Sequence, residues 1–362
     1  MESNAGRRII RLMLPLSLLF LLLALAAAGC GSSSSGSSSE QTESSQSGGP
    51  AKASSEEIPP YNGPEKSLPT SYEEPEVKSG TKFVVGYLNP NGAVEGLQIE
   101  QQAIESEAAK YGGKTIAFDT QGDPQKQASD FKTLLTQGVT AIVLQPSDPL
   151  SLAPAVKEAT SMGIPIVGVA TPAEVGPPNL PGYTTDVLQG QDQCAYRNMA
   201  LIAQAEPGGN FVVMGTVLPY PALEYLTARM QYWGKRLGLE SLGEVKTKFA
   251  DPKDGSEAMA TILSRYPEVK NVPVWLDGVA LGAATTARAN GKTDIRILGS
   301  NGEKAAIEAV EAGELYATCK QDFAGIGEEA VKAAYNAQTG QNLPMPKKIV
   351  VPPASVTEGA AG

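Results

Sequence analysis

The chain has 362 residues, with 29 Lys and Arg against 39 Asp and Glu, and it contains no histidine. The resulting net charge of −10 argues against nucleic acid binding, which needs basic surface. Without histidine, a Ser-His-Asp or Cys-His enzyme is excluded, and the commonest metal ligand is missing. Asp148, Asp277 and Glu224 could supply the carboxylate pair of an enzyme, but no spacing supports such a pair. We expect a protein that is not an enzyme and uses neither metal nor cofactor, and the chain is long enough for two domains.

The N-terminus has the order of a secretion signal. Three arginines within residues 7–11 precede an apolar stretch at 12–28, which ends just before Cys30. The apolar run is long for a signal peptide, so a retained membrane anchor is the alternative. The sequence Leu-Ala-Ala-Ala-Gly-Cys at 25–30 resembles a bacterial lipoprotein box. That resemblance implies removal of 1–29, acylation of Cys30, and an extracytoplasmic, membrane-anchored protein.

Residues 30–79 form the expected tether between the lipid and the folded part. Residues 31–50 contain ten Ser and four Gly, and such a composition cannot bury enough apolar surface to fold. Residues 51–79 are rich in Pro and Glu and predict a stiffer, mostly irregular extension. Part of this extension can lie against the folded domain.

A β-α-β-α-β pattern starts at residue 82. Three short apolar runs, at 83–88, 114–118 and 141–144, are typical of strands buried on both faces of a parallel sheet. Helical patterns of usual crossover length separate them, at about 97–108 and 124–135. This arrangement predicts right-handed crossovers and an open parallel sheet.

Polar residues follow the strands of this sheet. Asn89 and Asn91 come after the first run, Gln145 and Asp148 after the third, and Thr171 after a fourth strand. Loops at strand ends are polar in many proteins without a site. In open α/β sheets, however, ligands bind outside the carboxyl ends of the strands, so several polar tips in register favour a binding site.

A second series of strands and helices follows. We predict strands at 210–214, 242–248, 271–276, 295–298 and 315–319, with helices between them. A helix at 326–338 and a strand at 348–351 complete the chain. Tyr220 follows a strand end and is a candidate for stacking on a ligand. Asp277 could accept a hydrogen bond from a ligand or cap the helix that follows it.

Residues 82–352 resemble the periplasmic sugar-binding proteins of ABC importers, of the ribose and galactose type. Ordered motifs carry the resemblance: Gln-Pro-Ser-Asp at 145–148, Gly-Ile-Pro-Ile-Val at 163–167, the run at 275–283, Gly-Ser-Asn-Gly at 299–302, and Ala-Thr-Cys-Lys-Gln at 317–321. The resemblance implies two Rossmann-like α/β lobes with parallel sheets, joined by a three-strand hinge, in the type I periplasmic binding protein fold.

The resemblance also implies a division of the chain and a role. Lobe 1 would consist of 80–185 with 322–352, lobe 2 of 186–321, and 353–362 would be a tail. Crossovers are expected near 184–186, 321 and 351–352. A monomer would close on a ligand between its lobes and dock on a membrane permease with its ATPase. A ligand-sensing protein for a receptor is the alternative.

The expected site combines strand tips with motif positions. The candidates are Asn89, Asn91, Gln145, Asp148, Thr171, Tyr220, Arg229, Asp277, Asn301 and Gln321. Arg229 matches an arginine of the family. The first loop lacks the family's aromatics, Thr171 stands where an Asp-Arg pair is usual, and Asn301 stands where Asp is usual. We expect a sugar or sugar derivative, with a non-sugar organic acid held by Arg229 as the alternative.

Two cysteines remain if Cys30 is acylated. The resemblance places Cys194 at the start of the first helix of lobe 2 and Cys319 on a hinge strand. An extracytoplasmic location permits a disulfide between them, and two separate buried thiols are the alternative.

Overall fold

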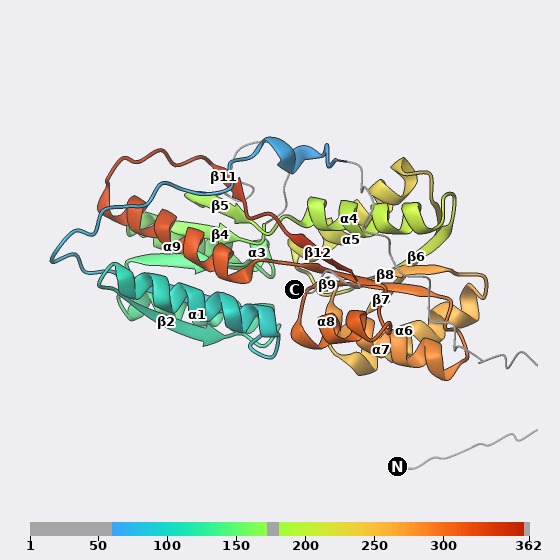
Figure 1. Cartoon of the computed structure of the whole chain (residues 1–362). Coiled ribbons are helices and arrows are strands. Elements are labelled where there is room, and N and C mark those ends of the chain that lie inside the picture. Colours follow the sequence, from blue (N-terminus) through green and yellow to red (C-terminus); the bar gives the residue numbers. More distant parts are fainter. Residues whose placement is uncertain (1–59, 172–180, 358–362) are drawn as a thin grey trace, which may run out of the picture. The chain divides into compact units, whose positions relative to one another are not determined.

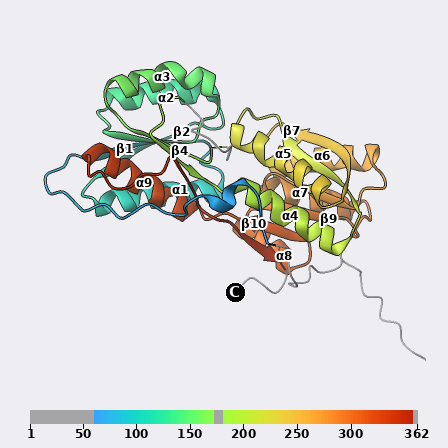
Figure 2. The same cartoon turned by 90° about the horizontal axis from the view of Figure 1, so that it is seen from above.

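The computed structural model describes residues 60–171 and 181–357, and these form the two-lobed α/β fold in Figures 1 and 2. The predicted signal peptide, the predicted acylation site at Cys30 and most of the predicted tether lie outside the described residues. No helix in the described ranges is long and apolar enough to cross a membrane.

Lobe 1 contains a parallel six-stranded sheet with the order β11-β5-β4-β3-β1-β2. Its strands are β1 (Val84–Asn89), β2 (Lys114–Asp119), β3 (Ala141–Leu144), β4 (Ile166–Val169), β5 (Thr185–Leu188) and β11 (Lys348–Val350). The three strands predicted first are confirmed as strands. However, β2 is only partly buried, because it lies at the sheet edge.

Helices cover both faces of this sheet. They are α1 (Glu95–Lys110), α2 (Pro124–Thr136), α3 (Pro149–Ser161) and α9 (Phe323–Thr339). Figure 2 shows α1 and α9 on one face and α2 and α3 on the other. Along β1, Val85 and Tyr87 pack on the first face, while Val84 and Leu88 pack on the second. This double burial explains the continuous apolar run, since successive strand residues point to opposite faces.

Lobe 2 contains the second sheet, with the order β12-β10-β9-β8-β6-β7. Its strands are β6 (Asn210–Thr216), β7 (Glu240–Thr247), β8 (Asn271–Pro273), β9 (Arg296–Asn301), β10 (Ala317–Lys320) and β12 (Ala354–Thr357). Its helices are α4 (Gln191–Ala205), α5 (Pro221–Arg236), α6 (Pro252–Arg265), α7 (Asp277–Ala289) and α8 (Lys304–Glu311). All strand pairs are parallel except β10 with β12.

The chain crosses between the lobes three times. The crossings lie at 189–190 between β5 and α4, at 321–322 between β10 and α9, and at 351–353 between β11 and β12. The expected boundary at 185/186 is wrong, because it falls inside β5, which pairs with β4 and β11. The expected tail at 353–362 is also wrong in part. Its first residues form β12, which pairs antiparallel with β10.

An N-terminal segment, residues 61–78, lies against both lobes, and we call it the strap. It begins on lobe 2, where a short 3-10 helix, η1 (Pro64–Ser67), follows Tyr61. The Tyr61 hydroxyl donates to Asp192. The Glu65 carboxylate, 1% exposed, accepts from the backbone N–H groups of Asp192 and Gln193, at 3.0 and 3.1 Å. The strap therefore caps the start of α4.

The strap then passes the hinge and reaches lobe 1. The backbone N–H of Val350 donates to the Pro69 carbonyl at 2.9 Å. The Tyr72 backbone N–H donates to Glu329 at 2.6 Å, and the Lys78 N–H donates to the Tyr335 hydroxyl at 2.8 Å. One short segment thus contacts lobe 2 first, then the end of β11 beside the third crossing, and then α9 of lobe 1.

Candidate functional site

A pocket opens between the two lobes, and we call it the cleft pocket. Its lining comprises Pro90, Asn91, Val94, Leu97, Gly122 and Gln145 from lobe 1, Leu218, Tyr220, Leu223, Leu226, Ala250, Trp275, Leu276 and Asn301 from lobe 2, and Gln189, Gln191, Gln321 and Phe323 at the crossings. Both lobes and the hinge therefore contribute to one site.

The strand ends position most of these side chains. In lobe 1, Asn91 follows β1 and Gln145 follows β3. In lobe 2, Tyr220 precedes α5, Trp275 follows β8, and Asn301 ends β9 with a φ of 113°. The cleft pocket thus lies at the carboxyl ends of both sheets, which is where open α/β sheets bind ligands.

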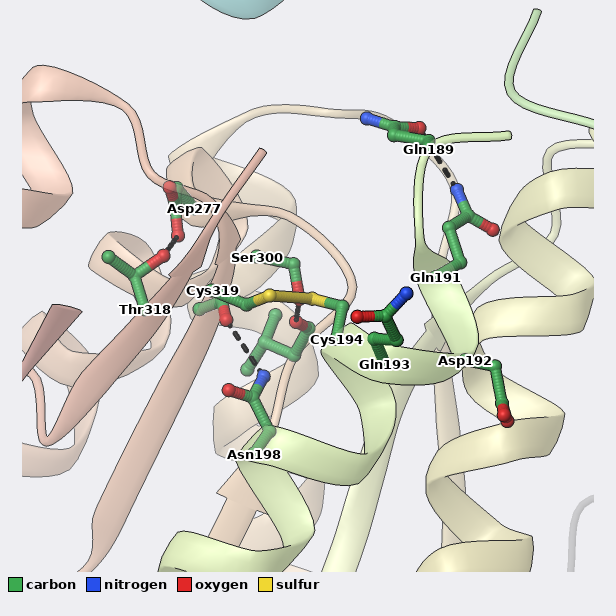
Figure 3. Close-up of a disulfide and its surroundings, with 12 residues drawn as sticks. Gln189, Gln191, Asp192, Gln193, Cys194, Asn198, Asp277, Ser300, Thr318 and Cys319 are labelled. Carbon is green, nitrogen blue, oxygen red and sulfur yellow. Dashed lines mark hydrogen bonds between the residues drawn. A yellow bond between two sulfur atoms is a disulfide. The ribbon is translucent and has the colours of Figure 1, made fainter. Parts of the chain in front are cut away.

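Three residues that line the cleft pocket carry a buried polar atom with no hydrogen-bond partner in the described ranges. The Gln191 amide nitrogen donates to Gln189 Oε1 at 3.1 Å (Figure 3), whereas Gln191 Oε1 has no hydrogen-bond partner in the part of the chain that the structure describes. Gln321 Oε1 and the Tyr220 hydroxyl are also buried without a hydrogen bond. Burial and the nearby carboxylates of Asp123 and Asp119 raise the pKa of Tyr220 to about 12, so its hydroxyl stays neutral. Buried polar atoms of this kind require partners, and a ligand can supply them.

Half of the predicted site residues come together here. The structure brings Asn91, Gln145, Tyr220, Asn301 and Gln321 into the cleft pocket. Their contact with a ligand stays a prediction. A role for Thr171 in binding also stays a prediction; this residue follows β4 and is the last described residue before 172–180. Thr171 is buried, its hydroxyl has no hydrogen-bond partner among the described residues, and it is not among the lining residues.

Two of the predicted residues hold the backbone instead. Asn89 donates to the Leu97 carbonyl at 3.3 Å and accepts from the Asn91 N–H at 3.0 Å, so it fixes the first loop. Asp148 caps α3, where it accepts from the backbone N–H groups of Leu150 and Ser151. Neither residue lines the cleft pocket.

Asp277 serves neither of the two roles considered for it. It is fully buried, and it accepts from the Thr318 hydroxyl and from the Glu303 N–H, both at 2.7 Å. It therefore joins β10 to the start of α8, whereas its own helix lacks a side-chain cap. Burial raises the pKa of Asp277 to about 8.

The prediction for Arg229 is wrong. Arg229 forms an ion pair with Asp192 and lies with its guanidinium carbon 3.8 Å from the centroid of the Tyr232 ring. The same carboxylate accepts from the Trp233 indole N–H at 2.8 Å. Arg229 thus contacts α4 and is not among the residues that line the cleft pocket, so the organic acid alternative loses the arginine on which it was based.

Several lining residues were not predicted. Gln189 and Gln191 lie on either side of Gly190, at the first crossing. The sequence could have indicated them as lining residues only if this crossing had been located at Gly190. Trp275 has the features of a core residue, because it is 4% exposed and its indole N–H donates to the Thr247 hydroxyl at 2.9 Å. It nevertheless lines the cleft pocket as well. In the described ranges, no group of His, Cys, Asp or Glu could hold a metal ion.

A disulfide supports lobe 2 beside this site. Cys194 on α4 and Cys319 on β10 are bonded, with their Cα atoms 5.7 Å apart (Figure 3). That separation is in the usual range for disulfides. Nearby, Asn198 donates to the Gly299 carbonyl at 3.0 Å. The alternative of two separate thiols is thus wrong, and α4 is fixed to the second sheet by a covalent bond.

Two α/β lobes, three crossings and a pocket at the strand ends define the class of two-lobed solute-binding proteins. The chain belongs to one family within it: the periplasmic binding protein domain matches residues 85–342. The fold is that of the type I periplasmic binding proteins, and the protein is a solute-binding protein.

The relatives agree with this assignment. The ribose import binding protein of Bacillus subtilis is 28% identical over 250 residues, which cover 67% of this chain and 77% of the relative. A xylitol-binding protein of Mycolicibacterium smegmatis is 27% identical over 215 residues, 55% of this chain and 56% of that protein. An ABC transporter solute-binding protein of Bacillus halodurans, solved with bound myo-inositol, is 27% identical with a TM-score of 0.67 and covers 77% of this chain and 96% of its own.

Proposed function

We propose that this protein is the extracytoplasmic receptor of an ABC importer, held at the membrane by a lipid on Cys30. It captures a small uncharged sugar or polyol in the cleft pocket and delivers it to a permease with its ATPase. The observation that carries this proposal is the cleft pocket itself, whose polar groups come from both lobes and from the crossings. A ligand that contacts both lobes stabilises the conformation in which they approach each other.

The chemistry of the lining supports an uncharged, hydroxylated solute. Six side-chain amides line the cleft pocket: Asn91, Gln145, Gln189, Gln191, Asn301 and Gln321. Amides both donate and accept hydrogen bonds, as hydroxyl groups do. The relatives named above carry ribose, xylitol and myo-inositol in their names or structures, and all three are uncharged and hydroxylated.

A binding screen tests this proposal. The full-length mature protein would be titrated with ribose, xylitol, allose, myo-inositol and glycerol, followed by thermal unfolding and calorimetry. A solute at a hundredfold excess over its Kd stabilises the protein by about 2.7 kcal/mol, which raises the unfolding temperature measurably. Stabilisation by an organic acid or amino acid, with none by any sugar or polyol, would contradict the assignment of the solute.

Uptake separates the importer from the sensor alternative. In cells that lack this gene, uptake of the radiolabelled solute should fall at low external concentration and recover on complementation. A sensor would leave uptake unchanged. For the anchor, Cys30→Ser should shift the protein from the membrane fraction to the medium or leave it unprocessed. Unchanged fractionation of this variant would contradict lipid anchoring.

A further inference from the structure

The walls of the cleft pocket are mostly apolar on both sides. Lobe 1 contributes Val94 and Leu97, and lobe 2 contributes several residues, among them Leu223 and Leu276. Phe323 adds an aromatic ring near the second crossing. A solute bound between the lobes therefore meets hydrocarbon or aromatic surface from two directions. Such surface favours a ligand with apolar area of its own.

No residue that lines the cleft pocket in the described ranges carries a formal charge. The carboxylates that act on Tyr220 belong to Asp119 and Asp123, and both are engaged by backbone N–H groups. A carboxylate on a ligand would lose its water here without gaining a cationic partner, which is costly. The lining thus selects against anionic solutes.

Two of the buried polar atoms without a hydrogen bond in the described ranges lie next to the crossings. Gln191 Oε1 and Gln321 Oε1 lie next to the first and second crossings, and both can only accept. The Tyr220 hydroxyl can donate or accept. A ligand that satisfies these atoms must carry at least two hydrogen-bond donors on the side that faces the hinge.

We propose that the natural ligand is uncharged and amphipathic, with its hydrogen-bond donors facing the hinge and a hydrocarbon or aromatic part between the lobe walls. Deoxygenated or aryl-substituted sugars have this character, and a nucleoside would too. The side-chain amides can pair with hydroxyl groups on one side of a ligand, but hydroxyl groups that face the leucine side chains of the walls would find no partner there. This inference rests on the proposed function and narrows the class of its ligand.

A matched ligand series tests the inference on the full-length mature protein. The series compares D-galactose with D-fucose, which lacks one hydroxyl, phenyl β-D-galactoside, which adds an aromatic ring, and D-galacturonate, which adds a charge. D-Ribose, 5-deoxy-D-ribose and uridine form a second series. In at least one series, the deoxy or aryl member should bind at least tenfold tighter than the parent by calorimetry, and the acid should not bind.

The outcomes separate this inference from the proposed function. If the parent sugars bind as tightly as or tighter than their deoxy and aryl partners, the inference is overturned while sugar capture stands. If the acid binds tightest, both are overturned. If no member of either series binds, the inference is overturned as well, and the wider polyol screen decides the proposed function alone.

A pair of variants adds a test within the protein. Leu218 lines the cleft pocket and is partly exposed, so Leu218→Asn should fold. It should reduce the preference for the deoxy or aryl ligand over its parent by at least fivefold. The matched control is Val217→Asn, since the neighbouring Val217 is 57% exposed and is not a lining residue. An equal effect of both substitutions, or no change with Leu218→Asn, would overturn the inference.

Discussion

Removing the Cys194–Cys319 disulfide should lower the free energy of unfolding strongly without changing the binding site. The bond closes a loop with a sequence separation of 125 residues. In the chain-entropy account, such a loop restricts the unfolded chain by about 16 cal/mol/K, which corresponds to about 5 kcal/mol at 25 °C. Both sulfur atoms are buried in lobe 2, so Cys194→Ala with Cys319→Ala removes the bond and leaves little polar mismatch.

The assay is urea unfolding of the double variant beside the wild type, with and without a reductant. Reduction should destabilise the wild type and leave the variant unaffected. Hydrogen exchange should show lost protection in lobe 2, while lobe 1 keeps its protection until global unfolding. Ligand affinity should change less than threefold. A loss in the free energy of unfolding below about 1 kcal/mol, or two free thiols in the denatured wild type, would refute the reasoning.

Three further changes test individual contacts. Arg229→Ala should lower the free energy of unfolding by about 3 kcal/mol, because the carboxylate of its partner Asp192 stays buried without it. Ligand affinity should not change, and a tenfold loss of affinity would show that Arg229 contributes to binding. Gly282→Ala should cost about 3 kcal/mol, since its Cβ would lie 1.8 Å from the Pro252 carbonyl oxygen and force α6 from α7. The control is Gly278→Ala in the same helix, whose Cβ would lie 3.9 Å from the nearest atom, and equal losses would contradict the packing argument. The folded pKa of Asp277 is raised from 3.8 to about 8, so ionisation opposes folding, and stability should fall as the pH rises from about 4 to 8. Asp277→Asn should flatten that part of the urea-unfolding profile, and an unchanged slope would show that another group is responsible.

The fold was largely predictable because local pattern and tertiary burial agree in most strands. β1 reads as a continuous apolar run because helices cover both faces of its sheet. β2 has a similar run but is half exposed, since its edge position depends on strand order rather than on its own residues. The antiparallel strand β12 could not be predicted from an apolar run, because it forms by pairing with β10, a segment about 35 residues away in sequence.

The site was predictable only where function depends on local position. Asn91 and Gln145 follow strands directly, and a strand end in an open sheet lies at the ligand-binding edge whatever else the chain does. Arg229 and Asp277 carry charges that suggested a role in binding, but each is engaged by a partner 37 or 41 residues away in sequence. Such pairing cannot be deduced from residue types alone. It removed two of the charged candidates from the site.

The strap has a consequence for how this chain matures. Its partners in lobe 1 are synthesised very late: Glu329 lies 257 residues after Tyr72, and Gln341 lies 265 residues after Glu76. An exported chain emerges from its N-terminus onward. The strap residues therefore lack their lobe 1 partners outside the cell membrane until nearly the whole polypeptide has crossed. Docking of the strap is then one of the last steps of folding, and long loop closure makes such contacts slow to form. A chain truncated before α9 would expose Tyr72 and Pro69 and could be recognised as unfinished by envelope proteases.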